Sequence, residues 1–124
     1  EQIAKNKRCT ISLGYMGIAE VVERFGIHFN SKEGHDLGIQ VIKHIKDKLD
    51  SNTGKYGIYF GLYATPGESL TTKFAKAIKQ FPEIPHVNDR DYITNSYHIP
   101  VEEEIDAFSK IDFESEFQRY STAG

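Results

Sequence analysis

Residues 63–70 carry the amino-acid types whose order best fits a binding chemistry. Thr65 is a favourable helix N-cap, Pro66 suits the first helical position, and Glu68 stands three residues after Thr65, as in a capping box. These signals predict a helix that begins at Pro66. The first N–H groups of a helix have no partner within the helix, and the helix dipole gives this end partial positive charge. The segment is therefore a candidate binding site for an anion.

A phosphate group is the anion that this helix start would suit best. Because Gly67 has no side chain, the anion could approach the backbone N–H groups of residues 67–69, and two hydroxyls could donate as well. Each hydrogen bond to a charged group contributes about 1.5–3 kcal/mol, whereas the helix dipole adds about 0.3–1 kcal/mol. The backbone donors would therefore dominate the affinity. The predicted phosphate site consists of Thr65, Pro66, Gly67, Glu68 and Ser69.

The same spacing also fits a purely structural role. A Thr-x-x-Glu pattern before an apolar stripe is a common capping box, which stabilises the helix without binding a ligand. The carboxylate of Glu68 would also repel a bound anion unless it turns back to the N–H of Thr65. Spacing alone leaves both phosphate binding and simple capping open.

A second candidate group is the polar run at residues 94–98, where Asn95 and Ser96 are possible substrate contacts. These side chains could instead face solvent. Cys9 could be a nucleophile, but no histidine is adjacent, so burial at a strand start is the preferred interpretation and its role stays open. The histidines lack the spacing of a metal site, and no catalytic residue or metal ligand is predicted. Four acidic residues are interpreted as a solvated face at a helix N-terminus rather than a cation site: Glu102, Glu103, Glu104 and Asp106.

The apolar periodicity predicts the elements that would position these groups. Alternation at residues 10–13 predicts a strand that enters a glycine-bounded turn at residues 14–17. A first helix follows and ends at Gly26. Its amphipathic stripe is Ile18, Val21, Val22 and Phe25.

A second helix is predicted from Asn30, with a capping-box-like start, to residues 52–54. Residues 57–64 are apolar on both faces, which is typical of a strand between parallel neighbours and under helices. The buried stripe of the second helix is Leu37, Val41, Ile42, Ile45 and Leu49.

Two further helices and a weaker strand complete the pattern. The third helix runs from Pro66 to Phe81, before the prolines at 82 and 85. Residues 91–99 are a strand candidate, and Pro100 ends it. The overall rhythm predicts an α/β fold with about three mostly parallel strands and flanking helices. The stripe of the fourth helix is Val101, Ile105, Phe108 and Ile111, with a kinked extension through Phe113, Phe117 and Tyr120.

Composition limits the classes of function. The 124 residues form a single segment, 1–124, with 39% hydrophobic and 27% charged residues, as in soluble globular proteins. The net charge of −3 argues against a nucleic-acid partner, and no run is long enough for a membrane helix. One cysteine makes a structural zinc unlikely and favours the cytoplasm. Because the chain begins at Glu1 rather than Met, we expect a piece of a longer protein.

Three short motifs in order and spacing resemble the anaerobic, class III ribonucleoside-triphosphate reductases. They are Leu-Gly-Tyr-Met-Gly-Ile-Ala-Glu at residues 13–20, Tyr-Ala-Thr-Pro-Gly-Glu-Ser-Leu at residues 63–70, and Asp-Tyr-Ile-Thr-Asn-Ser-Tyr-His at residues 91–98. The resemblance covers nearly the whole chain. It implies that the chain is an internal fragment of a ten-stranded α/β barrel, and that residues 65–69 are the family's substrate-phosphate loop.

The resemblance also implies the chemistry of the parent enzyme. The family reduces ribonucleoside triphosphates at the 2′ carbon through a glycyl radical and a thiyl radical. Its cofactors are a glycyl radical installed by an S-adenosylmethionine/iron–sulfur activase, formate as reductant, structural zinc and allosteric nucleotides. The implied partners are the substrate, the rest of the barrel, a second copy in a homodimer and the activating enzyme.

Several family features are missing from these 124 residues. The radical-glycine motif and the zinc cysteines are not present, and Cys9 does not stand in the thiyl motif. We therefore expect the segment by itself to be catalytically inert. The alternative is a small standalone phosphate- or nucleotide-binding module without catalysis.

Overall fold

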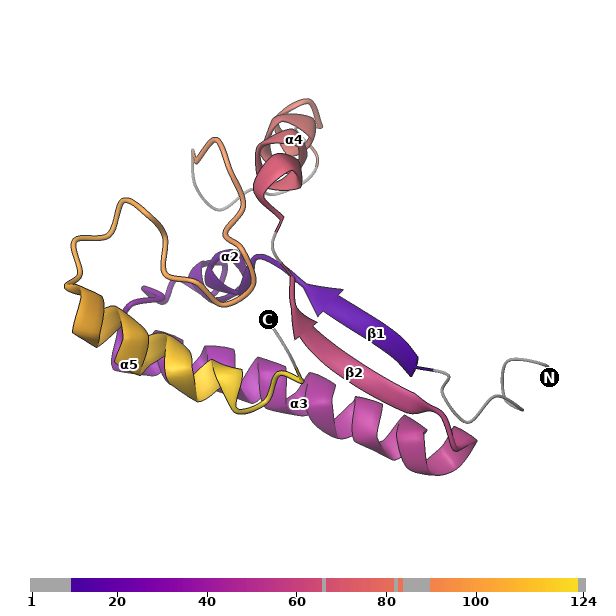
Figure 1. Cartoon of the computed structure of the whole chain (residues 1–124). Helices are drawn as coiled ribbons and strands as arrows, with labels where there is room; N and C mark the ends of the chain where they lie inside the picture. Colours follow the sequence, from indigo (N-terminus) through magenta and orange to yellow (C-terminus); the bar gives the residue numbers. More distant parts are fainter. Residues whose placement is uncertain (1–9, 66, 82, 84–89, 123–124) are drawn as a thin grey trace.

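The computed structural model describes residues 10–65, 67–81, 83 and 90–122, and these residues have an α/β arrangement (Figure 1). This confirms the predicted fold class. No helix in the described ranges is long and apolar enough to cross a membrane. The elements in order are strand β1 (Thr10–Tyr15), helices α2 (Ile18–Glu23) and α3 (Lys32–Tyr56), strand β2 (Tyr59–Ala64), and helices α4 (Glu68–Lys79) and α5 (Ala107–Gln118).

Strands β1 and β2 are parallel, with Thr10 opposite Tyr59 at one end and Tyr15 opposite Ala64 at the other. They form a two-stranded sheet within the described ranges. Parallel strands need a long crossover, and here α2 and α3 supply it. The carboxyl ends of both strands therefore lie at the same edge, next to α2 and the start of α4 (Figure 1).

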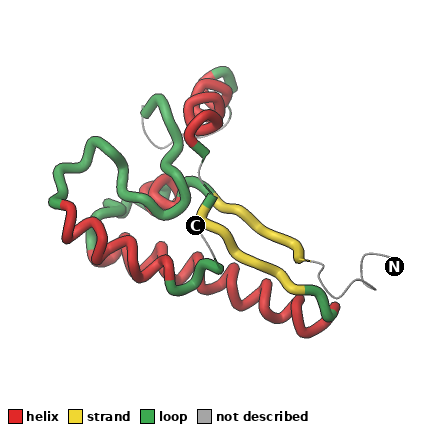
Figure 2. Tube along the Cα trace, in the orientation of Figure 1, coloured by secondary structure: helices red, strands yellow, loops and turns green. Residues whose placement is uncertain are grey.

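The third strand predicted at residues 91–99 is wrong. Those residues form turns and irregular loop (Figure 2). Their backbone groups bind the carboxyl edge of the sheet instead of a neighbouring strand: the Gly17 N–H donates to the Thr94 carbonyl (2.9 Å) and the Ile18 N–H to the Ser96 carbonyl (3.1 Å). The part of the chain that the structure describes therefore has two strands, where about three were predicted.

Helix α3 begins and ends at different residues from those predicted. Its N-cap is Ser31, one residue after Asn30, because the Ser31 hydroxyl accepts the Gly34 N–H at 3.0 Å. The helix continues past residues 52–54 because a glycine inside a helix costs only about 1 kcal/mol. It ends at Tyr56 and is capped by Gly57, which has a left-handed conformation (φ 64°) and donates its N–H to the Thr53 carbonyl at 2.9 Å.

The core lies where α3 and α5 pack beside β2 (Figure 1). The predicted stripe of α3 is confirmed: Ile42 and Leu49 are buried, and the other three residues are partly buried against the core. The stripe of the first helix is confirmed only in part, since α2 ends at Glu23 and two of its apolar side chains are exposed. The buried members are Ile18 and Val22, and the exposed ones are Val21 and Phe25.

The predicted start of the last helix is wrong. Helix α5 begins at Ala107, where the Asp106 carboxylate accepts the N–H groups of Phe108 and Ser109 at 3.0 Å each. The predicted extension is confirmed as the face toward the core, because Phe113 and Tyr120 are partly buried against it together with Phe117. Phe117 is fully buried, whereas three residues of the expected stripe are exposed: Val101, Phe108 and Ile111.

Candidate functional site

The connection between β2 and α4 differs from the predicted capping box. Gly67 is the N-cap and α4 begins at Glu68, two residues later than expected, with no side-chain cap. Thr65 is not the cap, because its hydroxyl donates back to the Tyr63 carbonyl at 3.4 Å. Pro66 lies outside the described residues, as do the side chains of Glu68 and Ser69. Cys9 also lies outside them.

Asn95 and Ser96 lie directly against this connection. The Gly67 N–H donates to the Asn95 side-chain oxygen at 2.8 Å, and the Ser96 hydroxyl donates to the Thr65 carbonyl at 3.1 Å. The structure therefore brings the two predicted groups of polar residues together at the carboxyl edge of the sheet. It also explains the late helix start, since the Gly67 N–H is bound by a side chain from a distant loop.

The loop at residues 94–96 is fastened from the other side by α2. The Glu20 carboxylate accepts the Thr94 N–H at 2.9 Å and the Thr94 hydroxyl at 2.6 Å. Ser96 has a positive φ of 45°, a conformation that is uncommon for residues other than glycine and needs support from its surroundings. The Ile18 N–H and the Thr65 carbonyl supply that support. Sequence reasoning missed Glu20, since nothing local distinguishes it from a surface carboxylate.

Arg90 fixes the other end of the same loop. Its guanidinium donates to both oxygens of Glu23 at 2.7 and 2.9 Å, and its Nε donates to Glu102. The Tyr92 hydroxyl also donates to Glu102 and accepts the Val101 N–H. Burial and the neighbouring Glu102 carboxylate raise the pKa of Tyr92 to about 12, so the hydroxyl keeps its proton. The cluster therefore clamps residues 90–102 onto α2.

Of the acidic residues near 102–106, only Asp106 lies at the helix N-terminus as predicted, because α5 begins only at Ala107. Glu102 binds Arg90, and a Glu103 carboxylate oxygen lies 3.1 Å from His28 Nε2. Asp106 caps α5. Among the residues that the structure describes, no group of three or more His, Cys, Asp or Glu side chains could hold a metal ion.

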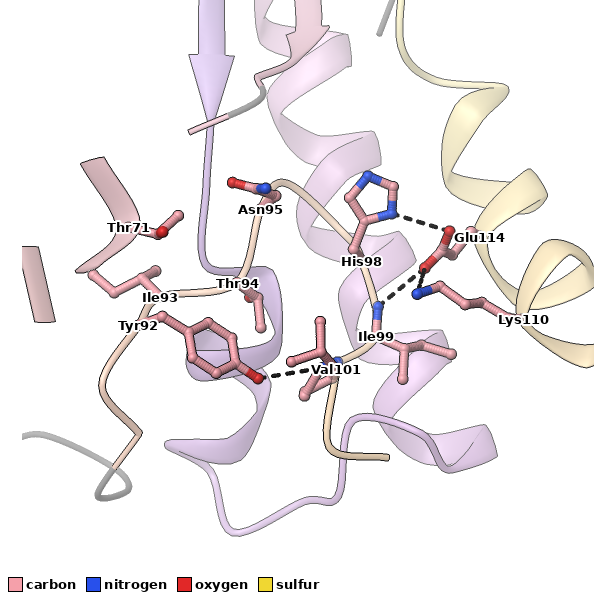
Figure 3. Close-up of a pocket in the computed structure, with 11 residues that line it drawn as sticks. Thr71, Tyr92, Ile93, Thr94, Asn95, His98, Ile99, Val101, Lys110 and Glu114 are labelled. Atoms are coloured by element: carbon pink, nitrogen blue, oxygen red, sulfur yellow. Dashed lines mark hydrogen bonds and ion pairs between the residues drawn. The ribbon is translucent and has the colours of Figure 1, made fainter. Parts of the chain in front are cut away.

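A pocket of about 490 Å³ opens beside Asn95 (Figure 3). Its walls come from α4, from residues 92–101 and from α5. Two of its polar groups form a pair: His98 Nδ1 lies 3.0 Å from Glu114, which also accepts the Ile99 N–H at 3.1 Å. The sequence placed His98 in the polar run at residues 94–98 but did not indicate Glu114 or Lys110, because only the packing of α5 brings these two residues to the loop.

Glu114 should make the packing of α5 sensitive to acid. Burial opposes its ionisation, but the hydrogen bonds from His98 and the Ile99 N–H, with the nearby Lys110 charge, outweigh it and hold the pKa below the ordinary 4.5. The folded state then binds fewer protons than the unfolded state, so stability is present above that ordinary value and is lost as pH falls toward the folded pKa.

When the pH is lowered from about 6 to about 3, we therefore expect the free energy of unfolding to decrease less in Glu114→Gln than in the unmodified chain. Urea unfolding at a series of pH values measures this difference. Glu102, whose pKa is also lowered, titrates in both proteins and cancels in the comparison. Identical pH dependence of the two proteins would contradict the assignment.

Comparison with known proteins relates this chain to a family of longer enzymes. The chain is 35% identical over 127 residues to the anaerobic ribonucleoside-triphosphate reductase of Haemophilus influenzae, covering 99% of this chain and 18% of that protein. The reductase of Escherichia coli is 34% identical over 127 residues, with the same coverage. The reductase of Enterobacteria phage T4 is 34% identical over 124 residues, covering 99% of this chain and 19% of that protein.

The chain thus spans about a fifth of the length of these relatives. Residues 1–124, the whole chain, match the sequence model of the family described as anaerobic ribonucleoside-triphosphate reductase. This match agrees with the resemblance carried by the three motifs. The chain therefore belongs to the anaerobic ribonucleoside-triphosphate reductase family.

Proposed function

We propose that the chain forms one wall of the substrate site of a longer anaerobic ribonucleoside-triphosphate reductase, with residues 65–69 contacting the triphosphate. The observation that carries the proposal is the pair of hydrogen bonds that joins the loop after β2 to Asn95 and Ser96. The junction stands at the carboxyl ends of two parallel strands, the edge at which open α/β sheets bind their ligands.

The backbone at the start of α4 supplies the proposed donors. The N–H of Gly67 is taken by Asn95, so the donors for an anion are the N–H groups of residues 68 and 69, which have no partner within a helix that starts at Glu68. Asn95 holds the turn in place by a bond that does not use those two groups. Preorganised donors of this kind bind a phosphate without a lysine.

The proposed reaction is the reduction of ribonucleoside triphosphates, the reaction for which the relatives are named. On this proposal the glycyl radical, its activating enzyme, the thiyl cysteine, formate and zinc act from other parts of the longer enzyme, and these residues belong to its barrel and homodimer. The chain alone is proposed to be catalytically inert. Formation of any deoxyribonucleotide by the purified chain with an activating enzyme would contradict this.

Ser69→Ala tests the phosphate loop. Loss of one hydroxyl donor to a charged group should weaken the binding of inorganic tripolyphosphate by about tenfold or more. Isothermal titration of the 124-residue chain measures the affinity. Thr72→Ala is the matched control, because Thr72 is an exposed hydroxyl residue of the same helix and should leave the affinity unchanged. Equal affinity in all three proteins, or no binding by the unmodified chain, would refute the phosphate loop.

A further inference from the structure

We propose that the pocket between α4, the loop at residues 92–101 and α5 binds the nucleoside end of a nucleotide, with His98 accepting a hydrogen bond from a ribose hydroxyl (Figure 3). The class of ligand rests on the proposed function, since the relatives act on ribonucleoside triphosphates by name. The pocket itself, and the pair His98–Glu114 within it, rest on geometry alone.

The orientation of His98 leaves one ring nitrogen available for a ligand. Nδ1 faces the Glu114 carboxylate at 3.0 Å, so in the neutral ring Nδ1 carries the proton and Nε2 has a lone pair. Figure 3 shows the second ring nitrogen pointing away from Glu114. The His98 side chain is 46% exposed, and its Nε2 has no partner among the described residues. A hydroxyl is the ligand group that such an acceptor binds.

Glu114 is held firmly enough to fix this orientation. One carboxylate oxygen accepts the Ile99 N–H at 3.1 Å, while the other faces His98. Lys110 lies 3.7 Å away, one turn earlier on α5. The Glu114 side chain is only 15% exposed, so the loop backbone, α5 and the imidazole form one connected unit.

The remaining walls suit an uncharged, partly planar ligand. The Tyr92 ring and the apolar side chains of Ile93, Ile99, Pro100 and Val101 line the pocket, and a flat apolar wall favours a nucleobase. The volume of about 490 Å³ lies in the range of small-molecule sites, about 300–1,000 Å³. Lys110 and Glu114 offset each other in charge, so this end of the pocket favours a neutral group over a phosphate.

The position of the pocket would allow one nucleotide to occupy both the pocket and the proposed phosphate loop at residues 65–69. Asn95 lines the pocket and also holds the Gly67 N–H. Thr71, another lining residue, donates its backbone N–H to the Gly67 carbonyl at 2.8 Å. The pocket therefore adjoins the start of α4, where the phosphates are proposed to bind.

The test compares adenosine with 2′,3′-dideoxyadenosine, which lacks both ribose hydroxyls. Nuclear magnetic resonance titration of the isotope-labelled 124-residue chain follows signals of the loop and α5 at millimolar ligand. We expect adenosine to shift these signals and the dideoxy analogue to bind about tenfold more weakly. Without a ribose hydroxyl, the acceptor nitrogen of His98 has no hydrogen-bond partner in the complex.

Two substitutions locate the acceptor. His98→Asn keeps a donor toward Glu114 but removes the acceptor at Nε2, so adenosine affinity should fall about tenfold while that of the dideoxy analogue stays the same. His98→Gln places a carbonyl near the lost Nε2 and should restore part of the affinity. His44→Asn, at an exposed histidine of α3, is the matched control and should bind like the unmodified chain.

Equal affinity for the two nucleosides would overturn the proposal, as would normal adenosine binding by His98→Asn or no adenosine binding at all. The comparison of nucleosides needs only the unmodified chain, so it decides the question even if His98→Asn fails to fold. Tripolyphosphate binding and its response to Ser69→Ala are measured separately. A failure of the phosphate loop is therefore distinguishable from a failure of the nucleoside pocket.

Discussion

Replacing Phe117 with alanine is expected to lower the free energy of unfolding by about 3–5 kcal/mol, the usual cost of removing a fully buried phenylalanine. The ring is fully buried. It stacks on Tyr97 with ring centroids 5.3 Å apart and packs against His35 in a T-shaped arrangement with centroids 5.1 Å apart. It also packs so closely on α3 that a Cβ at Gly38 would lie 3.0 Å from the ring. Few neighbours can move into the space that it leaves.

Urea unfolding monitored by circular dichroism measures this loss. Phe108→Ala is the matched control, because Phe108 lies on the same helix but is 82% exposed; its effect should stay within about 0.5 kcal/mol. Similar losses in the two variants would show that α5 does not pack as described. The result also bears on function, since α5 carries Glu114, the partner of His98.

Arg90→Ala is expected to lower the free energy of unfolding by about 3 kcal/mol, the low end of the range for removing one partner of a buried ion pair. The Arg90 side chain is 13% exposed and that of Glu23 is 14% exposed. Burial opposes the charge on Arg90, but the hydrogen bonds and charges of Glu23 and Glu102 raise its pKa. Without the guanidinium, the largely buried Glu23 carboxylate loses the hydrogen bonds to both of its oxygens.

Two further variants separate the clamp from a general effect of charge. Arg24→Ala removes an exposed arginine of the α2 end and should change stability by less than about 0.5 kcal/mol. Arg90→Lys keeps the positive charge but cannot donate to both oxygens of Glu23 and to Glu102 at once. Its loss of free energy of unfolding should therefore lie between the losses of Arg90→Ala and Arg24→Ala. A loss for Arg90→Ala as small as for Arg24→Ala would mean that the cluster does not fasten residues 90–102.

Local patterns correctly predicted the parts of the fold that depend on one element at a time. The apolar stripe of α3 repeats at helical spacing, and its residues do face the core. The apolar run before residue 65 predicted a strand with a parallel neighbour, and β2 pairs with β1 in that way. These predictions succeed because burying one face of a helix or strand requires only the periodicity of that element.

The errors occur where a backbone group is bound by a residue from far along the chain. Residues 91–99 have strand-like composition, but their backbone and side chains bind α2 and Thr65 instead of another strand. Thr65 has the residue type of an N-cap, yet Asn95 takes the Gly67 N–H and α4 starts later. Residue types show which hydrogen bonds are available, but they do not show which partner is close enough.

The family, the α/β class and the two groups of polar residues could be identified from the amino-acid sequence alone. The three motifs, the periodicity and the order of elements were sufficient for these conclusions. Only the tertiary structure decided that Asn95 binds Gly67, that Arg90 joins Glu23 to Glu102, and that Glu114 orients His98. The physical reason is that each of these pairs joins segments whose separation is closed by packing, and packing depends on the whole chain rather than on local spacing.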